Sequence, residues 1–405
     1  MACPVVSDKS AIVTRGAPES KANGAPASFL HLQSKQVTLA AGTLQPRRPS
    51  DQAGFALVLT LVVIAVLALV TQMMSAWLTT ALEDAIANQH EVEARQQMAD
   101  AKAIALYLLA ACPVSFRGLE MTVGQVRSIG LTEEPRNAEN FIRLDDSPYR
   151  LGGALLRFQD ARGLINLNLG LPGDVYALLG ILGVPAEDRD GLIDKLLDYL
   201  DADSFRRLNG AEAPEYLEAG LDPPANAPLR TPLEVRRVLG WRDIEGLARD
   251  DTVWPRLTSI APVAGFNVNT APRPLLMLIP SLNSDMVDQI MAVRRTTPIA
   301  GSLAWQALTG IPLEAPPART FYFPSSTVVL TLSAEHWPLE RRLSVRQTPR
   351  LADGPWVIDF DLETPRAARA MARKKLPTTS RFPSFFLRRP NDAESGDRDK
   401  NVPFV

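Results

Sequence analysis

Carboxylates between Asp194 and Glu215 form the acidic cluster of the sequence that is best suited to hold a cation. The cluster consists of Asp194, Asp198, Asp201, Asp203, Glu212 and Glu215. Helical spacing places the first three close to one face, and Asp203 begins a loop. Hard cations such as calcium take several oxygen ligands of this kind from loops. The same acids also fit a solvated helix C-terminus, although negative charge is unfavourable at that end. Both interpretations remain open from the residues alone.

No catalytic constellation is visible in the sequence. The three histidines, His31, His90 and His336, are scattered along the chain and lack the spacing of metal ligands. No glycine-rich phosphate loop follows an expected strand. The formal net charge of −2 argues against a nucleic-acid binder driven by phosphate contacts. We therefore expect a protein that is not an enzyme.

The junction Gln52-Ala53-Gly54-Phe55 suggests proteolytic processing just before a long helix. Arg47 and Arg48 lie upstream, and the run 55–112 contains neither Gly nor Pro and no charge until Glu83. About 20 apolar residues cross a bilayer, so this run is long enough to do so. An unbroken helix here would be about 85 Å long before Pro113 ends it.

Charge on the two sides of the apolar run predicts its orientation. Lys and Arg outnumber Asp and Glu by six to three in residues 1–54, whereas Glu83 and Asp84 follow the span. The positive-inside rule then places the N-terminus in the cytoplasm and the bulk of the chain on the exported side. Residues 1–54 have no sustained hydrophobic period, and we expect them to be disordered.

This arrangement resembles the cleavage site of type IV pilins and type II secretion pseudopilins. The resemblance implies that a membrane peptidase cuts after Gly54 and methylates the new amine of Phe55. Major pilins carry Glu at the fifth mature position, where this chain has Leu59. That departure resembles the minor pseudopilins of the general secretion pathway protein K family. The alternative is an uncleaved signal anchor.

Two asparagine-bearing motifs strengthen the resemblance. Residues 160–168 read DARGLINLN, and residues 266–271 read FNVNTA. Each precedes an expected helix–hairpin–helix, so the pair predicts a weak internal repeat. Apolar periodicity predicts helices at 174–182, 186–200, 231–239, 242–247, 274–279 and 285–294, and strands at 155–158, 327–333, 339–347 and 356–362.

The resemblance covers roughly residues 50–350 and implies an α+β fold. We expect a leader that is cleaved at 1–54, a pilin-like transmembrane and stalk helix at 55–112 and an α/β pilin-like sheet domain at 113–170 and 300–364. An inserted all-helical domain of helix–hairpin–helix (SAM-like) type is expected at 171–299, and a disordered tail at 365–405.

The resemblance also implies a function, partners and a cellular location. It implies a minor pseudopilin at the tip of the type II secretion pseudopilus, which initiates assembly and supports export of folded proteins. Its partners would be other minor pseudopilins, the major pseudopilin, the prepilin peptidase, the inner-membrane secretion platform and secreted proteins, with no nucleic acid. The protein would be a single-pass protein of the bacterial inner membrane with a periplasmic ectodomain.

Calcium is a second implication of the resemblance. The stretch from Asp198 to Tyr216 resembles the family's acidic loop, and we take Asp201, Asp203 and Glu212 as the candidate ligands. Ser204 departs from the family pattern, in which another acid often follows.

Two other functions remain as alternatives. A membrane-anchored helix–hairpin–helix protein of the competence type would bind DNA, but such hairpins usually carry Gly and Lys or Arg at the turn. Here the turns are 182–184 and 280–282, with Glu187 and Asp285 soon after them. We therefore favour the hairpins as protein-docking surfaces. The other alternative is an unprocessed periplasmic scaffold.

Overall fold

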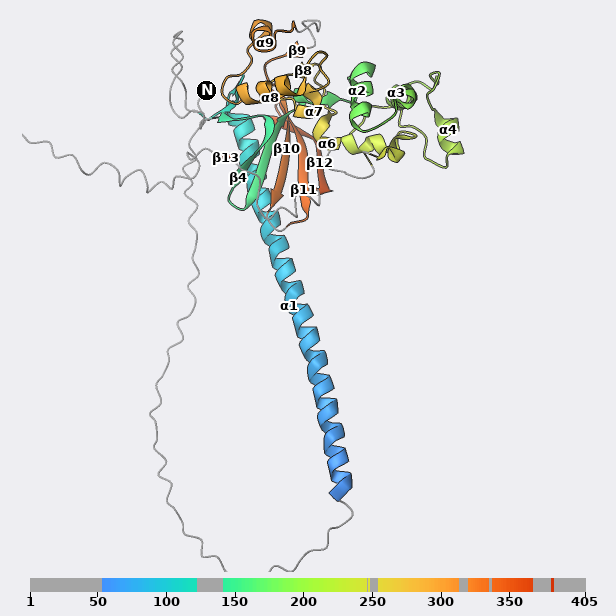
Figure 1. Ribbon diagram of the computed structural model, residues 1–405, viewed down its shortest axis with the longest axis vertical. Coiled ribbons are helices and arrows are strands. Elements are labelled where there is room, and N and C mark those ends of the chain that lie inside the picture. Colours follow the sequence, from blue (N-terminus) through green and yellow to red (C-terminus); the bar gives the residue numbers. More distant parts are fainter. Residues whose placement is uncertain are drawn as a thin grey trace, which may run out of the picture. The chain divides into compact units, whose positions relative to one another are not determined.

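The computed structural model describes residues 53–121, 141–245, 247, 254–312, 320–334, 337–366 and 380–381 (Figure 1). The expected leader up to residue 52, the segment 123–128 and most of the tail lie outside these residues. The fold is α+β, as predicted from the sequence.

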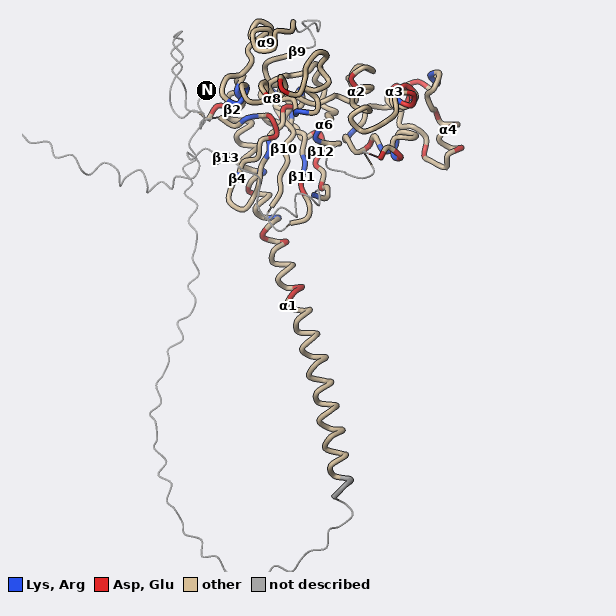
Figure 2. Tube along the Cα trace, viewed as in Figure 1, with Lys and Arg blue, Asp and Glu red and all other residues tan. Residues whose placement is uncertain are grey.

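A single long helix, α1 (Ala53–Ala111), forms where the break-free run predicts one. In the described chain, it is the helix long and apolar enough to cross a membrane. The helix has no charged residue before Glu83 in the sequence, and Figure 2 shows a long tan stretch of its tube without the blue or red of charged residues. The hydroxyls of Thr60, Thr71 and Thr79 donate to carbonyls three or four residues earlier, at 2.7–2.9 Å. Their polar groups are thus satisfied inside the helix, as a lipid environment requires.

Beyond Asn88, α1 packs into a compact core. Ala94, Met98, Ala101, Ala105 and Leu108 are at most 4% exposed and recur every three or four residues. This spacing puts them on one helical face. Three of the five are alanines, so the helix backbone can approach the strands closely. The stripe packs against apolar side chains of a six-stranded sheet.

The six-stranded sheet has the order β12-β11-β10-β5-β4-β13. Its strands are β12 (Trp356–Pro365), β11 (Leu339–Gln347), β10 (Thr327–Ala334), β5 (Ala154–Asp160), β4 (Asp145–Leu151) and β13 (Ser380–Arg381). All neighbours are antiparallel except β13, which pairs parallel with β4.

Register across the sheet separates its two faces. Leu330 lies opposite Phe158 on one side and Leu343 on the other. All three belong to the core that α1 covers. The next rung pairs Thr331 with Arg157 and Arg342, so polar residues occupy the opposite face. The four strands predicted from sequence are confirmed as β5, β10, β11 and β12.

Two strand features differ from expectation. A small antiparallel sheet of β1 (Val114–Ser115), β2 (Gly118–Glu120) and β3 (Phe141–Ile142) was not predicted, because strands of two or three residues are too short to show a period. Strand β13 lies in the tail that we expected to be disordered, so that expectation is wrong at residues 380–381.

The chain between β5 and β10 is largely helical. It contains η2 (Ala161–Gly163), β6 (Ile165–Asn166), α2 (Pro172–Ile181), α3 (Ala186–Leu200), α4 (Ala213–Glu218), η3 (Pro232–Arg237), η4 (Trp241–Asp243), α6 (Trp254–Leu257), β7 (Thr258–Ser259), β8 (Phe266–Asn267), α7 (Arg273–Leu276), α8 (Ser284–Val293), α9 (Ser302–Thr309) and β9 (Thr320–Phe321). Strand β6 pairs with β7, and β8 pairs with β9, both parallel.

Helices predicted by apolar period are confirmed at α2, α3, α7 and α8, with boundaries shifted by up to three residues. The two helices expected at 231–239 and 242–247 instead begin as the short 3₁₀ turns η3 and η4. Helix α9 falls inside the range 300–364 that we assigned to the sheet domain. Helix α4 was missed, because six residues give little periodic signal.

Two separate apolar cores stabilise this helical region. The larger is centred on α2 and α3 and includes Trp241 and Trp254, whose rings meet edge to face at 5.6 Å. Each indole N–H donates to a backbone carbonyl at 2.9 Å, on Leu192 and Pro232. The smaller core surrounds Trp305 and lies among α7, α8 and α9.

Charged groups join α6 to the polar face of the sheet. Arg256 pairs with Asp146 at 2.8 Å and with Glu340 at 3.0 Å. Arg342, which is 3% exposed, donates to the carbonyl of Pro255. These contacts hold the helical region against the side of the sheet that α1 does not cover.

Candidate functional site

The acidic loop runs from the end of α3 to the start of α4 and brings most of the predicted cluster together. Asp198 lies in the last turn of α3, Asp201 caps its C-terminus, and Glu212 is the N-cap of α4. The Oδ1 atom of Asp203 accepts a hydrogen bond from the backbone N–H of Phe205 at 2.9 Å. Asp194 is turned to another partner, the backbone N–H of Asn209, at 3.1 Å.

Arg207 neutralises part of this cluster. Its Nη1 lies 2.6 Å from Asp198 Oδ1 and 2.5 Å from Asp201 Oδ2. Asp198, fully buried, also accepts from the backbone N–H of Arg207 at 3.1 Å. Gly210 allows this packing, since a Cβ there would lie 1.9 Å from Asp198 Oδ2. In this arrangement the described residues contain no group of three or more His, Cys, Asp or Glu side chains placed to hold a metal ion.

Three buried oxygens in or near the acidic loop nevertheless lack a hydrogen-bond donor within the described structure. They are Asp201 Oδ1, Glu212 Oε1 and Asn226 Oδ1. Asn226 is brought to the loop by its Nδ2, which donates to the carbonyl of Asp203 at 2.6 Å. Burial raises the pKa of Glu212, and the nearby carboxylates of Asp198, Asp201 and Asp203 raise it further. Unpaired carboxylate and amide oxygens are the kind of ligand atom that calcium prefers.

Sequence reasoning missed Arg207 and Asn226 in this site. Arg207 crosses the loop to the acids, and Asn226 reaches them from beyond α4, so neither follows a helical spacing. The signal that could have found Arg207 is a basic residue inside an otherwise acidic loop.

The two asparagine motifs form equivalent structural units. Asn166 Oδ1 accepts from the backbone N–H of Asn168 at 2.9 Å, and Asn267 Oδ1 accepts from that of Asn269 at 3.0 Å. The second asparagine of each pair, Asn168 or Asn269, forms hydrogen bonds with both the backbone N–H and the carbonyl of a residue distant in the sequence. These bonds confirm the internal repeat and assign it a role in closing loops. Neither motif carries a reactive group.

Asp160 links the second motif to the sheet. It is fully buried and accepts from Asn267 Nδ2 and Thr270 Oγ1, both at 2.9 Å. Its other oxygen accepts from the backbone N–H of Ser325 at 2.9 Å and from Ser325 Oγ at 2.7 Å. The turn that we recognised as part of a family motif is therefore a polar junction in the core.

The turn of the first helical hairpin has well-defined backbone geometry. The N–H of Val184 donates to the carbonyl of Leu179 at 3.0 Å, and that of Gly183 to Gly180 at 3.1 Å. These two bonds, with Gly183 at φ +83°, make a Schellman motif, which needs a residue without a Cβ.

The arginine beside each hairpin makes its polar contacts with other groups of this chain. Arg189 Nε donates to the carbonyl of Val184 at 2.9 Å, and its guanidinium lies 4.9 Å from the ring centre of Tyr176. Near the second hairpin, Arg273 pairs with Asp288 at 2.7 Å.

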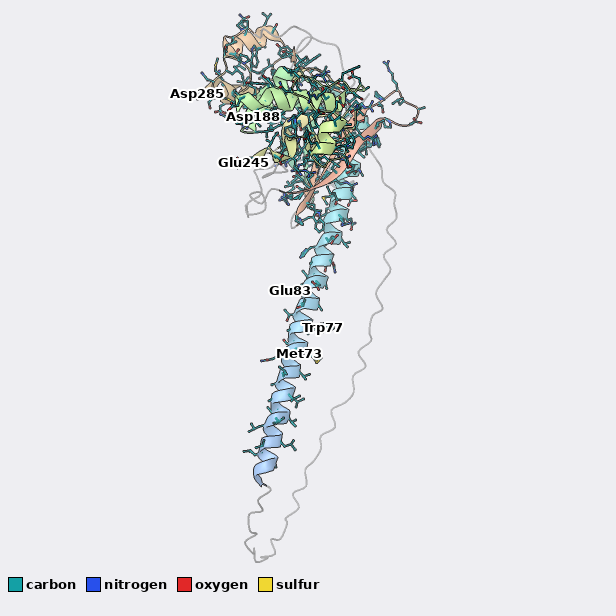
Figure 3. All side chains as sticks on the ribbon, turned by 90° about the vertical axis from the view of Figure 1, so that its right-hand side faces the viewer. Met73, Trp77, Glu83, Asp188, Glu245 and Asp285 are labelled. Carbon is teal, nitrogen blue, oxygen red and sulfur yellow. The ribbon has the colours of Figure 1, made fainter. Side chains whose placement is uncertain are left out.

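The residues predicted for processing and membrane insertion lie in the first turns of α1. Gly54 and Phe55 are in the helix backbone, and the Leu59 side chain is 54% exposed. The apolar side chains that follow are exposed along the whole segment, as Met73 and Trp77 illustrate at 66% and 71% (Figure 3). Such a surface is unstable in water and suits lipid or other apolar helices.

Among curated proteins, none matches the chain. A solved structure of the GspK-GspI-GspJ complex from the type 2 secretion system of enterotoxigenic Escherichia coli aligns with 69% of this chain and 98% of its own. That alignment has 18% identity and a TM-score of 0.39.

A family model matches the helical region that contains α2, α3 and the acidic loop. The matched residues are 173–245, and the model describes protein K of the type II secretion system (T2SS). This region was predicted as part of the inserted helical domain, and its first helical hairpin and acidic loop are the features described above. Residues 173–245 of this chain are therefore similar to protein K of the type II secretion system, a minor pseudopilin family.

Proposed function

We propose that this protein occupies the tip of the type II secretion pseudopilus, initiates its assembly and supports the export of folded proteins. The observation that carries the proposal is Leu59, an exposed apolar residue in the uncharged segment of α1. A carboxylate at this depth is costly unless a cation pairs with it. The Glu found here in major pilins pairs with the amine of a neighbouring subunit. A terminal subunit lacks one such neighbour, so leucine suits it.

Size supports the same position. About 290 residues follow the helix region (405 − 112 = 293), which is a large load for a subunit repeated along a thin fibre. A single copy at the end can carry this mass without blocking the subunits below it. Its partners would be other minor pseudopilins and the major pseudopilin, which would contact the exposed apolar surface of α1 between Leu57 and Leu82.

Processing is part of this proposal. The prepilin peptidase would cut between Gly54 and Phe55 and methylate the new amine, with the N-terminal side in the cytoplasm and the ectodomain in the periplasm. Mass spectrometry of the membrane-extracted protein should then find a methylated chain that begins at Phe55. Gly54→Trp should block the cut, whereas Gly54→Ala, which adds one methyl group, serves as the tolerant control. Retention of residues 1–54 in a strain with active peptidase would contradict the proposal.

We also propose that the acidic loop binds calcium through Asp201, Asp203 and Glu212. Its support is the pair of unpaired buried oxygens on Asp201 and Glu212, to which Asn226 adds an amide oxygen. Calcium would stabilise the ionised carboxylates and compensate for the negative charge that they bring together in the folded loop. Its role would be structural, since it would connect the end of α3 to the start of α4.

Deletion of the gene tests the functional proposal. Secretion should fall while the major pseudopilin remains present in the inner membrane, because the deletion would stop initiation and leave the supply of subunits unchanged. Complementation with the intact chain should restore secretion, and complementation with a chain that lacks residues 55–82 should not. Normal secretion in the deletion strain would contradict the initiating role.

A further inference from the structure

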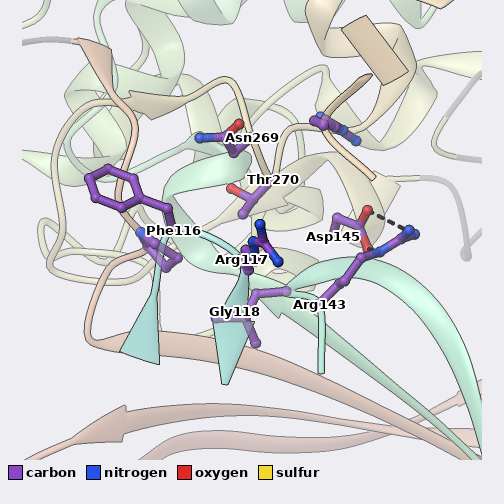
Figure 4. Close-up of a pocket in the computed structure, with 10 residues that line it drawn as sticks. Phe116, Arg117, Gly118, Arg143, Asp145, Asn269 and Thr270 are labelled. Carbon is purple, nitrogen blue, oxygen red and sulfur yellow. Dashed lines mark hydrogen bonds and ion pairs between the residues drawn. The ribbon is translucent and has the colours of Figure 1, made fainter. Parts of the chain in front are cut away.

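A small cavity lies where several segments far apart in the sequence meet. Its lining includes the β1–β2 turn at Arg117, the start of β4 at Arg143 and Asp145, the second asparagine motif at Thr270, and Arg294 (Figure 4). Its volume is ≈ 20 Å³. None of these residues belongs to the acidic loop or to the membrane segment, so the cavity is independent of the proposed function.

Arg294 is the feature of this cavity that requires explanation. It follows the last residue of α8 and is 8% exposed. Its Nη1 donates to the carbonyls of Val268 and Ala271, at 2.9 and 2.7 Å. Its Nε and Nη2 have no acceptor within the described structure. A buried guanidinium with two unused donors is costly unless something accepts from it.

The charges around the cavity are predominantly positive. Arg117, Arg143 and Arg294 line it, and Asp145 is the carboxylate among its lining residues. Asp145 is already paired with Arg143, at 3.1 Å between Oδ2 and Nη2, as Figure 4 shows. The lining therefore keeps an excess of positive charge after internal pairing.

Burial also lowers the pKa of Arg294 to about 10. The nearby Asp145 raises it, whereas Arg143 and Arg295 lower it further. At neutral pH the side chain is still charged, and no acceptor in the described structure balances the positive charge at its unused donors. A neutral water would satisfy one donor but would leave that charge uncompensated, which favours an anion as the occupant.

The size of the cavity limits the anion that can enter. A water-sized occupant needs about 10–15 Å³ of such space. The ≈ 20 Å³ found here matches a single-atom occupant better than phosphate or sulfate, each of which has five heavy atoms.

We propose that this cavity is a binding site for a single halide ion, for which chloride is the natural candidate. The ion would accept from the unused donors of Arg294, with Arg117 contributing charge from the β1–β2 turn. It would thereby tie the C-terminal end of α8 and the second asparagine motif to the small sheet. The site would stabilise the ectodomain.

The test measures the melting temperature of the full-length chain in a neutral detergent. Sodium chloride is replaced stepwise by sodium gluconate at constant ionic strength, since gluconate is too large for the cavity. We expect a saturable increase of about 2–5 °C in chloride at ten times its dissociation constant. Bromide should act in the same way. Equal melting temperatures in chloride and gluconate would overturn the proposal and assign the cavity to water.

Three variants locate the effect. Arg294→Met should lose the chloride-dependent increase, and ³⁵Cl NMR should show that it loses the excess line width seen with the unaltered chain. Because this variant also loses two bonds to carbonyls, the half-buried Arg117→Met provides a milder test, with a chloride midpoint about fivefold weaker or more. Arg295→Met removes an exposed charge one residue away and should retain the full increase. An increase retained in both Arg294→Met and Arg117→Met would place chloride elsewhere and overturn the site.

Discussion

Asn168 and Asn269 make the same pair of hydrogen bonds at corresponding places in the two repeat units. Asn168 accepts from the N–H of Leu229 at 2.9 Å and donates to its carbonyl at 3.0 Å. Asn269 accepts from the N–H of Ile299 at 2.9 Å and donates to its carbonyl at 2.8 Å. In each unit, one amide side chain thus makes the two hydrogen bonds that a neighbouring strand would make. The two motifs therefore close their loops in the same way.

The first prediction concerns this device. Asn168→Ala and Asn269→Ala should each lower the free energy of unfolding by about 1–3 kcal/mol, because each leaves a buried backbone donor and acceptor unpaired. The effects should be nearly additive, since the two residues share no partner. Denaturant unfolding in detergent measures both, with the exposed Asn209→Ala as the control. A loss no larger than that of the control would contradict the assigned role.

Asp160→Asn gives a second prediction. The carboxylate accepts hydrogen bonds from Asn267, Thr270 and Ser325. In the asparagine variant, the NH₂ group is a donor and would point at one or more of these donors. We expect a loss of at least about 1–3 kcal/mol in the free energy of unfolding. The same change at the exposed Asp353 should have an effect below about 0.5 kcal/mol. Equal stability of the two variants would show that Asp160 is not the junction described.

The sequence predicted most of the regular structure, because long elements carry their own period. The period-two pattern of β10 and β11 and the apolar stripe of α3 are examples. The 3₁₀ turn η3 replaced an expected helix because periodicity does not distinguish a short 3₁₀ segment from an α-helix.

The polar contacts could not be predicted in the same way. Arg207 and Asn226 reach the acidic loop through tertiary contacts that no local spacing encodes. Arg294 looks like an ordinary helix-ending arginine in the sequence, and only its burial distinguishes it. The long apolar helix α1 was predictable in full, since its signal is composition over a long run.

The third prediction joins pH and calcium at Glu212. The pKa of this group is raised above its ordinary value of 4.5, so the folded state keeps its proton to higher pH than the unfolded chain does. Without calcium, stability should therefore fall as pH rises from 4.5 through the raised pKa. Glu212→Gln should remove that fall and, with chelator at pH 7, raise the melting temperature.

Calcium should reverse this trend, because it binds the ionised carboxylates and competes with protons. At 100-fold over its dissociation constant it should raise the melting temperature by about 5–10 °C. Asp201→Asn should abolish this shift, and Asp194→Asn, whose carboxylate bonds to Asn209, should keep it. Identical melting curves in calcium and chelator would remove the ion from the account.

The fourth prediction compares two carboxylates in the membrane. Leu59→Glu and Leu61→Glu each place an acid on exposed apolar positions of α1, 54% and 58% exposed. At the tip, neither acid has an amine partner, so both should weaken membrane residence to a similar degree. Membrane fractionation and fibre incorporation measure this. Better incorporation of Leu59→Glu than of Leu61→Glu would contradict the tip position, because it would mean that a neighbouring amine is available.

Counting copies tests the central claim most directly. Quantitative mass spectrometry of sheared or crosslinked pseudopili should measure this chain against the major pseudopilin through isotope-labelled peptides of each. The tip position predicts one copy per fibre, so the ratio should fall as fibres lengthen when the major subunit is overproduced. A ratio near one to one, constant with fibre length, would contradict the account, because it would place this protein along the shaft.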